Sequence, residues 1–547
     1  MISNSPMGED MQPSGQQQPI FIMQEGTQQK RGRNAQGNNI SAARAVGEAV
    51  RSTLGPKGMD KMLVDNTGQV IITNDGATIL REVGIEHPAA KMVVEVAKTQ
   101  ESQCYDGTTS AVVLASELLK NAEELLEKGI HPTTITTGYR KGLEASLAIV
   151  NHLAEKTALE FEEGIPLKSI AMTALTGKSA ESSKELLGEI CVSAIQEVSS
   201  LEDIRTLTVT GGSVGDTTLF HGVALEKDKA HPRMVNEAIG KIAVLSCAIE
   251  AKQSKIEAQV QISDPTQVAA FLAEEENAIK EMVLHIESMG VAAVFAQKGV
   301  DDLAIHYLRR SETLVIEKVV RSDLDAICKA TGATMVSDIF DLGDDDLGES
   351  SIQVVNDYDM PFIRVASTAT PSPVSIIAFG STPHVAAEIE RALDDALGVC
   401  WLAYQKDSQI IVGGGAPHAH IATQIAKVSH EISKGRERMA VEAFGKSMMI
   451  IPQTIGENAG LDPVDVALIM GSEHRENNWK SALLIETEDE SGNALVCDGI
   501  EKLIIEPASV LKQALKSATE AAIMILRIDD VIMMRSEGPN NQGLQMG

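Results

Sequence analysis

The chain has 547 residues, enough for roughly two to four domains with sizeable cores. Hydrophobic residues make up 43% of it but aromatic residues only 3%, so its cores must consist of Ala, Val, Ile, Leu and Met, which favours helices. The formal net charge of -30 argues against nucleic acid and anionic membranes as partners, because phosphate binding needs a basic face.

The first part of the chain predicts a helix and a hairpin. Residues 1–17 are polar and are predicted to be disordered. Apolar residues at helical spacing predict a helix over 40–54. The apolar segments 62–64 and 70–72 flank a turn sequence, and this pattern predicts a β-hairpin.

Three helices are predicted to follow, over 77–82, 88–100 and 108–128. An Asn-Asp-Gly turn sequence leads into the first of them. Pro88 can occupy the first turn of the second, and Gly129 ends the third.

The middle of the chain changes character. Strand-like runs alternate there with helical segments, which predicts a separate α/β domain; the runs lie at 241–245, 291–295, 313–317 and 375–377. Asp264-Pro265, a cap residue followed by proline, predicts the start of a long helix with an apolar stripe. Another helix with one apolar face is predicted over 385–403, and beyond Gly413 the pattern returns to long helices.

The six cysteines include no C-x-x-C pair, so neither a zinc site nor a disulfide framework is predicted. We expect them to be small apolar residues in a reducing cytosol. The N-terminal stretch lacks the apolar region of a signal peptide, and no run of about 18 apolar residues occurs. The expectation is a cytoplasmic protein without a membrane partner.

Asp106 stands directly before Gly107, Thr108 and Thr109 at a predicted helix start. Hydrolysis of ATP needs a metal ion on the phosphates, donors around them and a carboxylate that orients the attacking water. A helix N-terminus offers N–H groups to phosphate, threonine hydroxyls add donors, and a single aspartate can suffice for Mg²⁺. An ordinary capped helix explains these residues about equally well.

Other acidic and glycine-rich elements are weak signals when taken singly. Asp75 lies in a turn sequence, and Asp395 follows Arg391 by four residues, as in a solvent-facing ion pair. The three glycines at 413–415 fit either a hinge or a close backbone approach to a ligand. The chain has no P-loop and no dinucleotide fingerprint, so the residues alone predict only a magnesium–nucleotide site in a helical protein.

Long stretches of the chain match one known pattern almost residue for residue. They include Thr-Leu-Gly-Pro-Lys-Gly-Met-Asp-Lys-Met-Leu-Val-Asp at 53–65, and further stretches at 73–80, 87–91, 297–304, 330–333, 457–462 and 525–530. These stretches resemble the subunits of group II chaperonins, the archaeal thermosome type of the TCP-1 family. The resemblance covers about residue 18 to about residue 536.

The resemblance implies a multidomain α and α/β chaperonin fold. It has a mostly helical equatorial ATP-binding domain, an α/β intermediate hinge domain, and an α/β apical domain that binds non-native protein and carries a helical lid protrusion. The implied boundaries are 18–165 with 410–536 for the equatorial domain, 166–233 with 377–409 for the intermediate domain, 234–376 for the apical domain, about 251–285 for the protrusion, and 1–17 and 537–547 for disordered tails.

The resemblance also implies roles for individual residues, with ATP and Mg²⁺ as cofactors. Asp106 matches the magnesium ligand, and Asp75 and Asp395 match the acidic pair that holds the attacking water. The nucleotide contacts carried over are Gly55, Pro56, Gly107, Thr108, Thr109, Lys178, Gly414, Gly415 and Glu506. Among these, Lys178 matches a lysine that senses the terminal phosphate, although on its own it is typical of a surface lysine.

The chain departs from the family pattern near the expected site. Tyr105 stands where the family has glycine before the magnesium aspartate, and a bulky residue cannot reach every conformation open to glycine. His418 and His420 replace a Glu-x-Glu pair; side chains two apart on a helix do not converge on one metal, so the loss of charges from a structural contact is the expectation. The segment 491–505, on the adenine side, retains little of the family sequence. These changes indicate a divergent paralogue.

Several functions fit these observations. The first is an active chaperonin subunit of a double ring, which encloses non-native proteins and closes its lid by ATP hydrolysis. The second is a structural or regulatory subunit with weak turnover that co-assembles with paralogues in a hetero-oligomeric ring, a hypothesis motivated by Tyr105. Without the resemblance, an unrelated acidic phosphohydrolase would remain.

Overall fold

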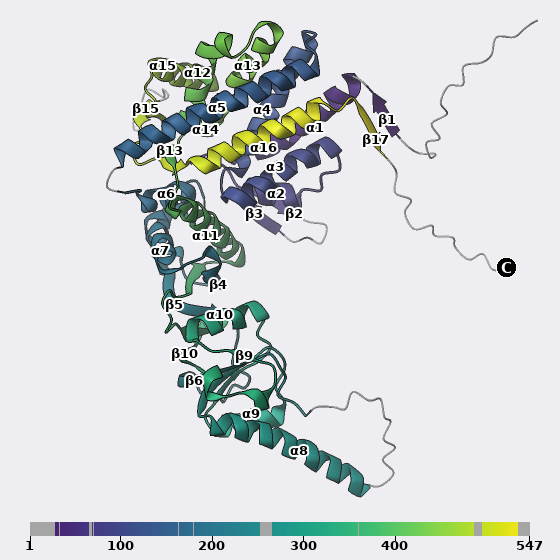
Figure 1. Ribbon diagram of the computed structural model, residues 1–547, viewed down its shortest axis with the longest axis vertical. Helices are drawn as coiled ribbons and strands as arrows, with labels where there is room; N and C mark the ends of the chain where they lie inside the picture. Colours follow the sequence, from purple (N-terminus) through teal and green to yellow (C-terminus); the bar gives the residue numbers. More distant parts are fainter. Residues whose placement is uncertain are drawn as a thin grey trace, which may run out of the picture.

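The computed structural model describes residues 28–31, 33–64, 68, 70–161, 164–178, 180–251, 265–358, 360–485 and 495–533. The molecule is elongated, with a helical block at one end, a β-sheet region at the other and a narrower middle part (Figure 1). The fold is therefore mixed α and α/β, as the sequence predicted. The predicted tails and residues 252–264 of the proposed protrusion, Asp264 among them, lie outside the described residues.

The helical block is built from both ends of the chain. Its helices are α1 (Arg33–Arg51), α2 (Gly76–Glu82), α3 (Pro88–Cys104), α4 (Thr108–Glu127), α5 (Pro132–Glu160), α12 (Ala416–Ile432), α13 (Gly435–Met448), α14 (Ile450–Asn458), α15 (Pro463–Arg475) and α16 (Ala508–Leu526). α4 packs on both α1 and α16, and α5 packs on α13, so one apolar core unites the two ends. The predicted helices in this part are confirmed.

Pairs of short antiparallel strands join segments of the helical block. β1 (Gln28–Arg31) pairs antiparallel with β17 (Asp530–Met533), next to each other in Figure 1 although they lie near opposite ends of the chain. The predicted hairpin is confirmed as β2 (Lys61–Val64) and β3 (Val70–Thr73). Further antiparallel pairs are β13 (Ile410–Val412) with β16 (Ile505–Pro507), and β14 (Ser481–Leu484) with β15 (Leu495–Asp498).

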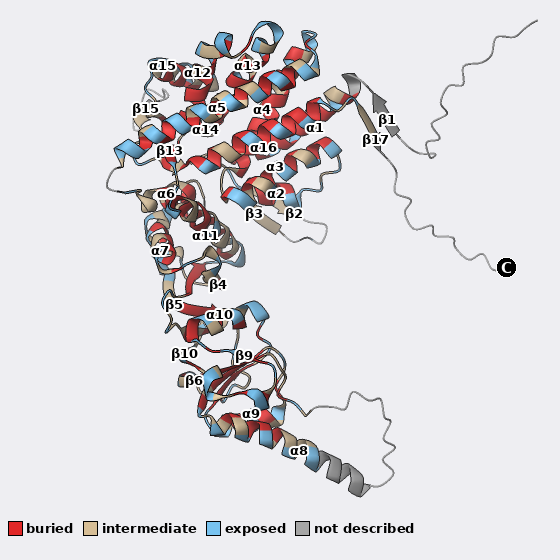
Figure 2. Cartoon of the chain, viewed as in Figure 1, coloured by how far each residue is buried: buried red, intermediate tan, exposed pale blue. Residues whose placement is uncertain are grey.

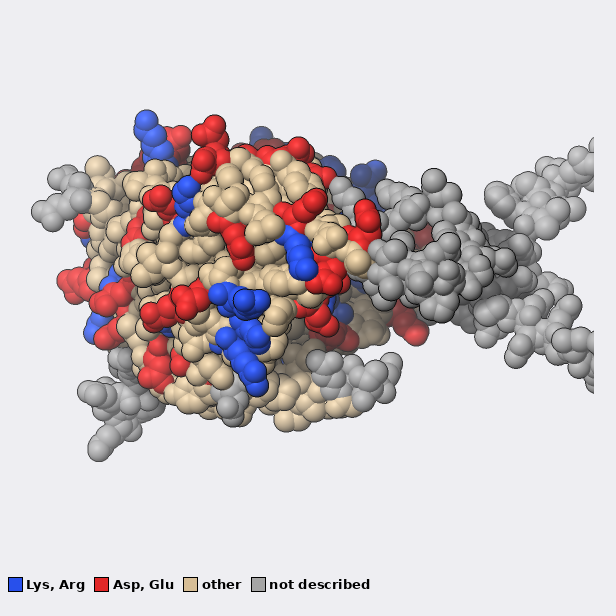
Figure 3. Space-filling model, turned by 90° about the horizontal axis from the view of Figure 1, so that it is seen from below, with Lys and Arg blue, Asp and Glu red and all other residues tan. Residues whose placement is uncertain are grey.

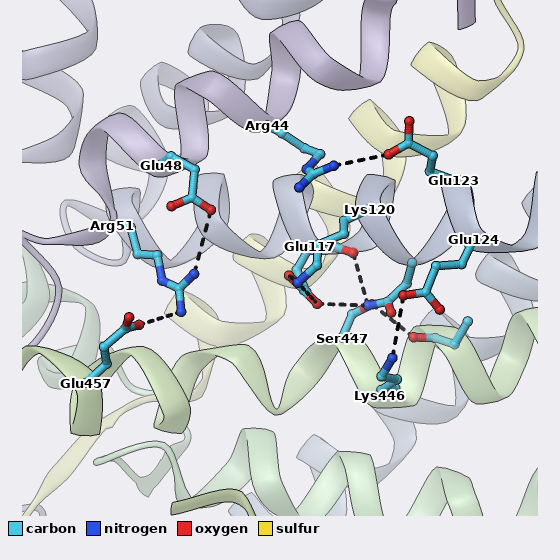
Figure 4. A network of polar contacts seen from close by, with 12 residues as sticks. Arg44, Glu48, Arg51, Glu117, Lys120, Glu123, Glu124, Lys446, Ser447 and Glu457 are labelled. Carbon is cyan, nitrogen blue, oxygen red and sulfur yellow. Dashed lines mark hydrogen bonds and ion pairs between the residues drawn. The ribbon is translucent and has the colours of Figure 1, made fainter. Parts of the chain in front are cut away.

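Polar contacts link the N-terminal and C-terminal helices (Figure 4). Arg51 of α1 forms an ion pair of 2.6 Å with Glu457 of α14. The buried amide of Asn121 donates to the Ser447 hydroxyl at 2.9 Å, which joins α4 to α13. Since exposed ion pairs contribute at most about 1 kcal/mol each, the buried Asn121–Ser447 bond is the more specific of these links.

The middle part holds α6 (Leu167–Leu175), α7 (Lys184–Glu197) and α11 (Pro383–Tyr404). α11 packs on α6 and α7 with the apolar face that the sequence predicted, because its stripe residues are all fully buried: Ile389, Leu393, Ala396 and Cys400. Here the chain passes from the helical block to the sheet region and back again (Figure 1).

A nine-stranded sheet runs from the middle part into the sheet region in the order β4-β12-β5-β11-β10-β6-β7-β8, with β9 beside β6. Its strands are β4 (Ile204–Thr210), β5 (Thr218–Leu225), β6 (Glu237–Leu245), β7 (Val291–Ala296), β8 (Leu314–Ile316), β9 (Met335–Val336), β10 (Gly348–Asp357), β11 (Met360–Ala366) and β12 (Val374–Gly380). The four predicted strands are confirmed. β12, however, lies parallel to β4 and away from the other three, because tertiary pairing decides strand order.

Three helices pack in the sheet region: α8 (Pro265–Ser288), α9 (Asp302–Arg310) and α10 (Arg321–Thr331). The part of the α8 stripe that the structure describes is buried as predicted, namely Ile279, Met282, Val283 and Ile286. Short 3₁₀ turns lie at Glu181–Ser183, Leu201–Asp203, Val214–Asp216, Ile339–Asp341 and Asp344–Asp346.

Buried residues follow the inner faces of the helices and strands throughout (Figure 2). Viewed from the end that carries α8, acidic and basic side chains are interspersed over a largely uncharged surface (Figure 3). Of the helices that the structure describes, none is both long and apolar enough to cross a membrane. Among the described residues, which include all six cysteines, no disulfide is formed, and Cys104, Cys191 and Cys400 are buried.

Candidate functional site

A cavity of about 320 Å³ lies between the helical block and the middle part. Its wall is formed by segments from both ends of the chain and from the middle. The lining includes every residue that the sequence analysis assigned to the site: Gly55, Pro56, Asp75, Asp106, Gly107, Thr108, Thr109, Lys178, Asp395, Gly414, Gly415 and Glu506. Gly58, three residues after Gly55, does not line the cavity, and a Cβ there would lie 2.2 Å from the Thr53 carbonyl oxygen.

The loop between α3 and α4 presents Asp106 and the start of α4 to the cavity. Gly107 is the N-cap of α4 with φ 77°, and it has no side chain to satisfy the first N–H groups of the helix. Thr108 and Thr109 begin the helix and line the cavity. Gln100 holds the loop from behind, donating from Nε2 to the Asp106 carbonyl at 2.8 Å. This part of the cavity therefore combines a carboxylate with a helix N-terminus suited to phosphate.

Asp75 caps a helix and also lines the cavity. As the N-cap of α2, its carboxylate accepts from the N–H groups of Ala77 at 3.2 Å and Thr78 at 2.7 Å. The Thr108 hydroxyl donates to the same carboxylate at 3.4 Å. Asp75 thus leads into α2 as the turn sequence predicted, and the capping hydrogen bonds hold its carboxylate at the cavity wall.

Asp395 reaches the cavity from α11 and pairs with Lys178, which follows α6. Lys178 Nζ lies 2.5 Å from Asp395 Oδ2, and both side chains are largely buried. Burial raises the pKa of Asp395 to about 7, against the opposing effect of Lys178. The solvent-facing pair of Arg391 with Asp395 is not formed, because Arg391 turns to Glu388 at 2.7 Å.

The loop that carries Lys178 docks directly on the helical block. The Asn74 amide donates to the Gly177 carbonyl at 2.7 Å. Gly177 has φ 80°, and a Cβ there would lie 2.6 Å from the Gly55 carbonyl oxygen. Only glycine allows this approach, which brings the middle part against the cavity rim.

Another part of the cavity wall is largely apolar. It comes from α14, β14 and the β16 region, and consists of Ile451, Ile455, Leu483, Ile485 and Ile504. Of these residues, only Ile504 lies in the segment 491–505 that the resemblance placed on the adenine side, and the others were not predicted, since ordinary core residues carry no distinguishing motif. Such a surface suits a nucleoside better than a phosphate chain.

Gly414, Gly415 and Glu506 lie at this apolar part of the wall. Gly415 has φ 78°, and a Cβ there would lie 2.9 Å from Pro452 Cβ, so the turn into α12 requires glycine. Burial raises the pKa of Glu506 to about 8, with Asp106 adding to the effect. A carboxyl group in this state can donate as well as accept a hydrogen bond.

His418, in the first turn of α12, is a cavity residue whose position the sequence analysis missed. Its ring is 6% exposed, and neither ring nitrogen has a hydrogen-bond partner among the described residues. Burial lowers its pKa to about 4, so the ring is neutral at neutral pH. His420, by contrast, does not line the cavity, and its ring lies 5.6 Å from that of His474.

Tyr105 ends α3 in the left-handed conformation, with φ 60° and ψ −13°. This conformation costs a residue with a Cβ roughly 1–2 kcal/mol. The position thus favours glycine, as the sequence analysis argued, yet Asp106 still lines the cavity beside Asp75 and Thr108.

The chain was compared with known proteins. The model of the TCP-1/cpn60 chaperonin family matches residues 46–536. The chain is 44% identical over 538 residues to the thermosome subunit beta of Methanothermobacter thermautotrophicus, covering 97% of each chain. It is 43% identical over 543 residues to the thermosome subunit alpha of Thermoplasma acidophilum, again covering 97% of each chain. It is 45% identical over 536 residues to a thermosome subunit of Methanopyrus kandleri, covering 95% of this chain and 96% of the relative. With matches of this extent, the chain belongs to the TCP-1/cpn60 chaperonin family.

Proposed function

We propose that the cavity is the site at which this chaperonin subunit binds and hydrolyses ATP. The chain is an ATP-dependent group II chaperonin that folds proteins. The residues that line the cavity would bind and hydrolyse the ATP on which this folding depends. One observation carries it: acidic, glycine and hydroxyl residues from three distant parts of the chain line a single cavity. A cavity of about 320 Å³ whose wall combines polar groups with apolar side chains suits a nucleotide, which combines phosphates with a nucleoside.

The polar part of the wall would hold the phosphates and Mg²⁺. Asp106 is the proposed metal ligand, and its carboxylate oxygens suit this hard cation. Among the described residues, no group of three or more His, Cys, Asp or Glu is placed to hold a metal, so phosphate oxygens and water would complete the coordination. When bound, Mg²⁺ neutralises charge that builds up on the phosphates. The N-terminus of α4, with Thr108 and Thr109, donates to the same oxygens.

Asp75 and Asp395 are the proposed holders of the attacking water. Asp395 would accept a proton from the water or orient it, and its raised pKa near 7 suits a general base at neutral pH. Lys178 would approach the terminal phosphate, leaving its ion pair with Asp395 when that phosphate is present. This exchange of partners would make Asp395 available only when ATP is in place.

The cavity wall depends on docking of the middle part, because Lys178 and Asp395 both come from it. We propose that hydrolysis is gated by this docking, within an equatorial, intermediate and apical domain arrangement at the boundaries implied by the sequence. Three large buried clusters support the division: one in the helical block, one around α6, α7 and α11, and one in the sheet region. Lid closure over a chamber that holds non-native protein would follow from the same movement.

The apolar part of the wall would hold the nucleoside, with His418 and Glu506 as its polar contacts. A buried ring nitrogen without a partner costs about 1–3 kcal/mol, and a ligand hydroxyl or base nitrogen would recover that cost. Because His418 is neutral, it can donate from one nitrogen and accept at the other.

The relatives are named alpha and beta subunits, which supports assembly of this chain into a ring with itself or with related chains. A regulatory subunit with weak turnover is the second candidate, favoured by the strained backbone at Tyr105. Magnesium-dependent ATP hydrolysis by the purified protein, measured together with particle size by light scattering, tests the proposal. Turnover by a large particle that refolds a denatured test protein supports an autonomous chaperonin. A particle that binds ATP without turning it over supports the second candidate, and the absence of ATP binding overturns both site assignments.

A further inference from the structure

Tyr105 and Gly398 interlock across the boundary between the helical block and α11. A Cβ on Gly398 would lie 2.0 Å from Cγ and 2.5 Å from Cβ of Tyr105. No real Cβ contact is that short, so the Tyr105 side chain occupies space that opens only because residue 398 is glycine. The ring also packs against the buried apolar cluster of α6, α7 and α11.

The contact with Gly398 stabilises Tyr105 in an unfavourable backbone conformation. A glycine at position 105 would adopt φ 60° without strain. Tyrosine adopts the same conformation, with its N–H bonded to the Glu101 carbonyl at 3.0 Å, and directs its ring onto α11. The contact with Gly398 therefore holds in place a residue that the backbone disfavours.

Both partners adjoin proposed site residues. Tyr105 directly precedes Asp106, and Gly398 lies one helical turn beyond Asp395 on α11. Because a helix is rigid over one turn, a shift of Gly398 relative to Tyr105 also shifts Asp395 relative to Asp106. The contact thus connects the loop of the metal ligand to the helix of the base.

We propose that Tyr105, seated on Gly398, is a positioning residue that sets the register of α11 against the Asp106 loop. It holds Asp395 at the distance from the bound phosphate that hydrolysis requires. The inference rests on the proposed ATP site and adds a residue pair to it. Tyr105, which stands where the family has glycine, therefore supports ATP hydrolysis in this chain and does not impair it.

A four-member set of full-length variants tests the interlock: wild type, Tyr105→Gly, Gly398→Ala and the double variant. Gly398→Ala forces the ring out of its place, so kcat for ATP hydrolysis should fall roughly 10- to 100-fold, because small misplacements of reacting groups have effects of this size. Tyr105→Gly should lower kcat as well. The double variant should be more active than Gly398→Ala alone, because no ring remains for the new methyl group to displace.

Three further measurements separate positioning from folding and from binding. The affinity for a nonhydrolysable ATP analogue with Mg²⁺ should change less than threefold across the set, since the contact lies outside the cavity wall. Tyr105→Phe keeps the ring, so it should retain wild-type kcat. Thermal unfolding should show the same non-additivity as kcat.

Distinct outcomes overturn distinct claims. Additive effects of the two substitutions on kcat, or wild-type kcat in Gly398→Ala, reject the interlock while leaving the ATP site intact. Parallel loss of analogue binding and kcat shows that Tyr105 only supports the fold of the loop, which also rejects the positioning role. A wild-type protein that binds no ATP rejects the proposed site, and the positioning role with it, even if unfolding shows that the two residues are coupled.

Discussion

Nζ of Lys178 lies 2.5 Å from Oδ2 of Asp395, although the two residues are 217 positions apart in the chain. Each arrives on a different segment of the middle part, and both line a cavity whose other walls belong to the helical block. The pair is largely buried, so its charges interact through a medium less polar than water. Any displacement of the middle part therefore changes the electrostatics of the site.

Replacing Asp395 by Asn should abolish hydrolysis and spare nucleotide binding. The amide keeps the shape of the side chain but cannot accept a proton, and loss of a general base typically costs 10²–10⁴-fold, which we take as roughly the expected fall in kcat. The measurement is steady-state ATP turnover at saturating Mg²⁺, with analogue binding by calorimetry. Asp394→Asn is the matched control, because Asp394 is the adjacent carboxylate and does not line the cavity. Equal turnover in the Asp395 and Asp394 variants would remove Asp395 from the mechanism.

The pH dependence of kcat/KM should report the ionisation of Asp395. Burial raises its pKa to about 7 in the free site, so kcat/KM should rise with pH through about 7 as the base becomes ionised. Lys178 lowers this pKa, so Lys178→Gln should move the rising limb to higher pH. The profiles of wild type and variant, measured at constant ionic strength, check the sign. A limb that stays in place, or moves to lower pH, contradicts the electrostatic role of Lys178.

Asp106→Asn should weaken the magnesium dependence of the reaction. The substitution removes the negative charge offered to the cation, so the Mg²⁺ concentration for half-maximal turnover should rise roughly tenfold or more, equivalent to at least about 1.4 kcal/mol. A magnesium titration at fixed ATP measures this shift. Asp60→Asn serves as a control, because Asp60 follows the Gly55 turn and does not line the cavity. An unchanged titration curve would show that Asp106 does not hold the metal.

His418→Phe should raise the KM for ATP with little effect on kcat. Phenylalanine preserves the buried ring and removes both nitrogens, and one net hydrogen bond is worth about 0.5–1.5 kcal/mol, or roughly two- to tenfold in affinity. His420→Phe is the control, because His420 is equally buried on α12 but does not line the cavity. A matching rise in KM in the His420 variant would indicate a general effect on α12 and not a contact with the nucleoside.

Local patterns predicted most individual elements. The α11 stripe, the β2–β3 hairpin and the start of α4 after Asp106 all appear as predicted, because helical and strand periodicity operates over a few turns of chain. Of the alternative interpretations of the acidic residues, the turn at Asp75 is confirmed and the ion pair at Asp395 is wrong. Asp75 is both a cap and a cavity residue, whereas the expected pairing of Arg391 with Asp395 is replaced by the contact between Arg391 and Glu388.

By itself, the sequence determined the family, most element types and the acidic, glycine and hydroxyl residues assigned to the site, because motif identity and short-range periodicity are properties of the chain alone. Only the tertiary structure decided which residues meet. It paired Lys178 with Asp395, seated Tyr105 on Gly398 and turned His418 to the cavity, where its ring has no hydrogen-bond partner among the described residues. The physical reason is that contacts between distant segments depend on how whole helices and strands pack, and no local pattern encodes that packing.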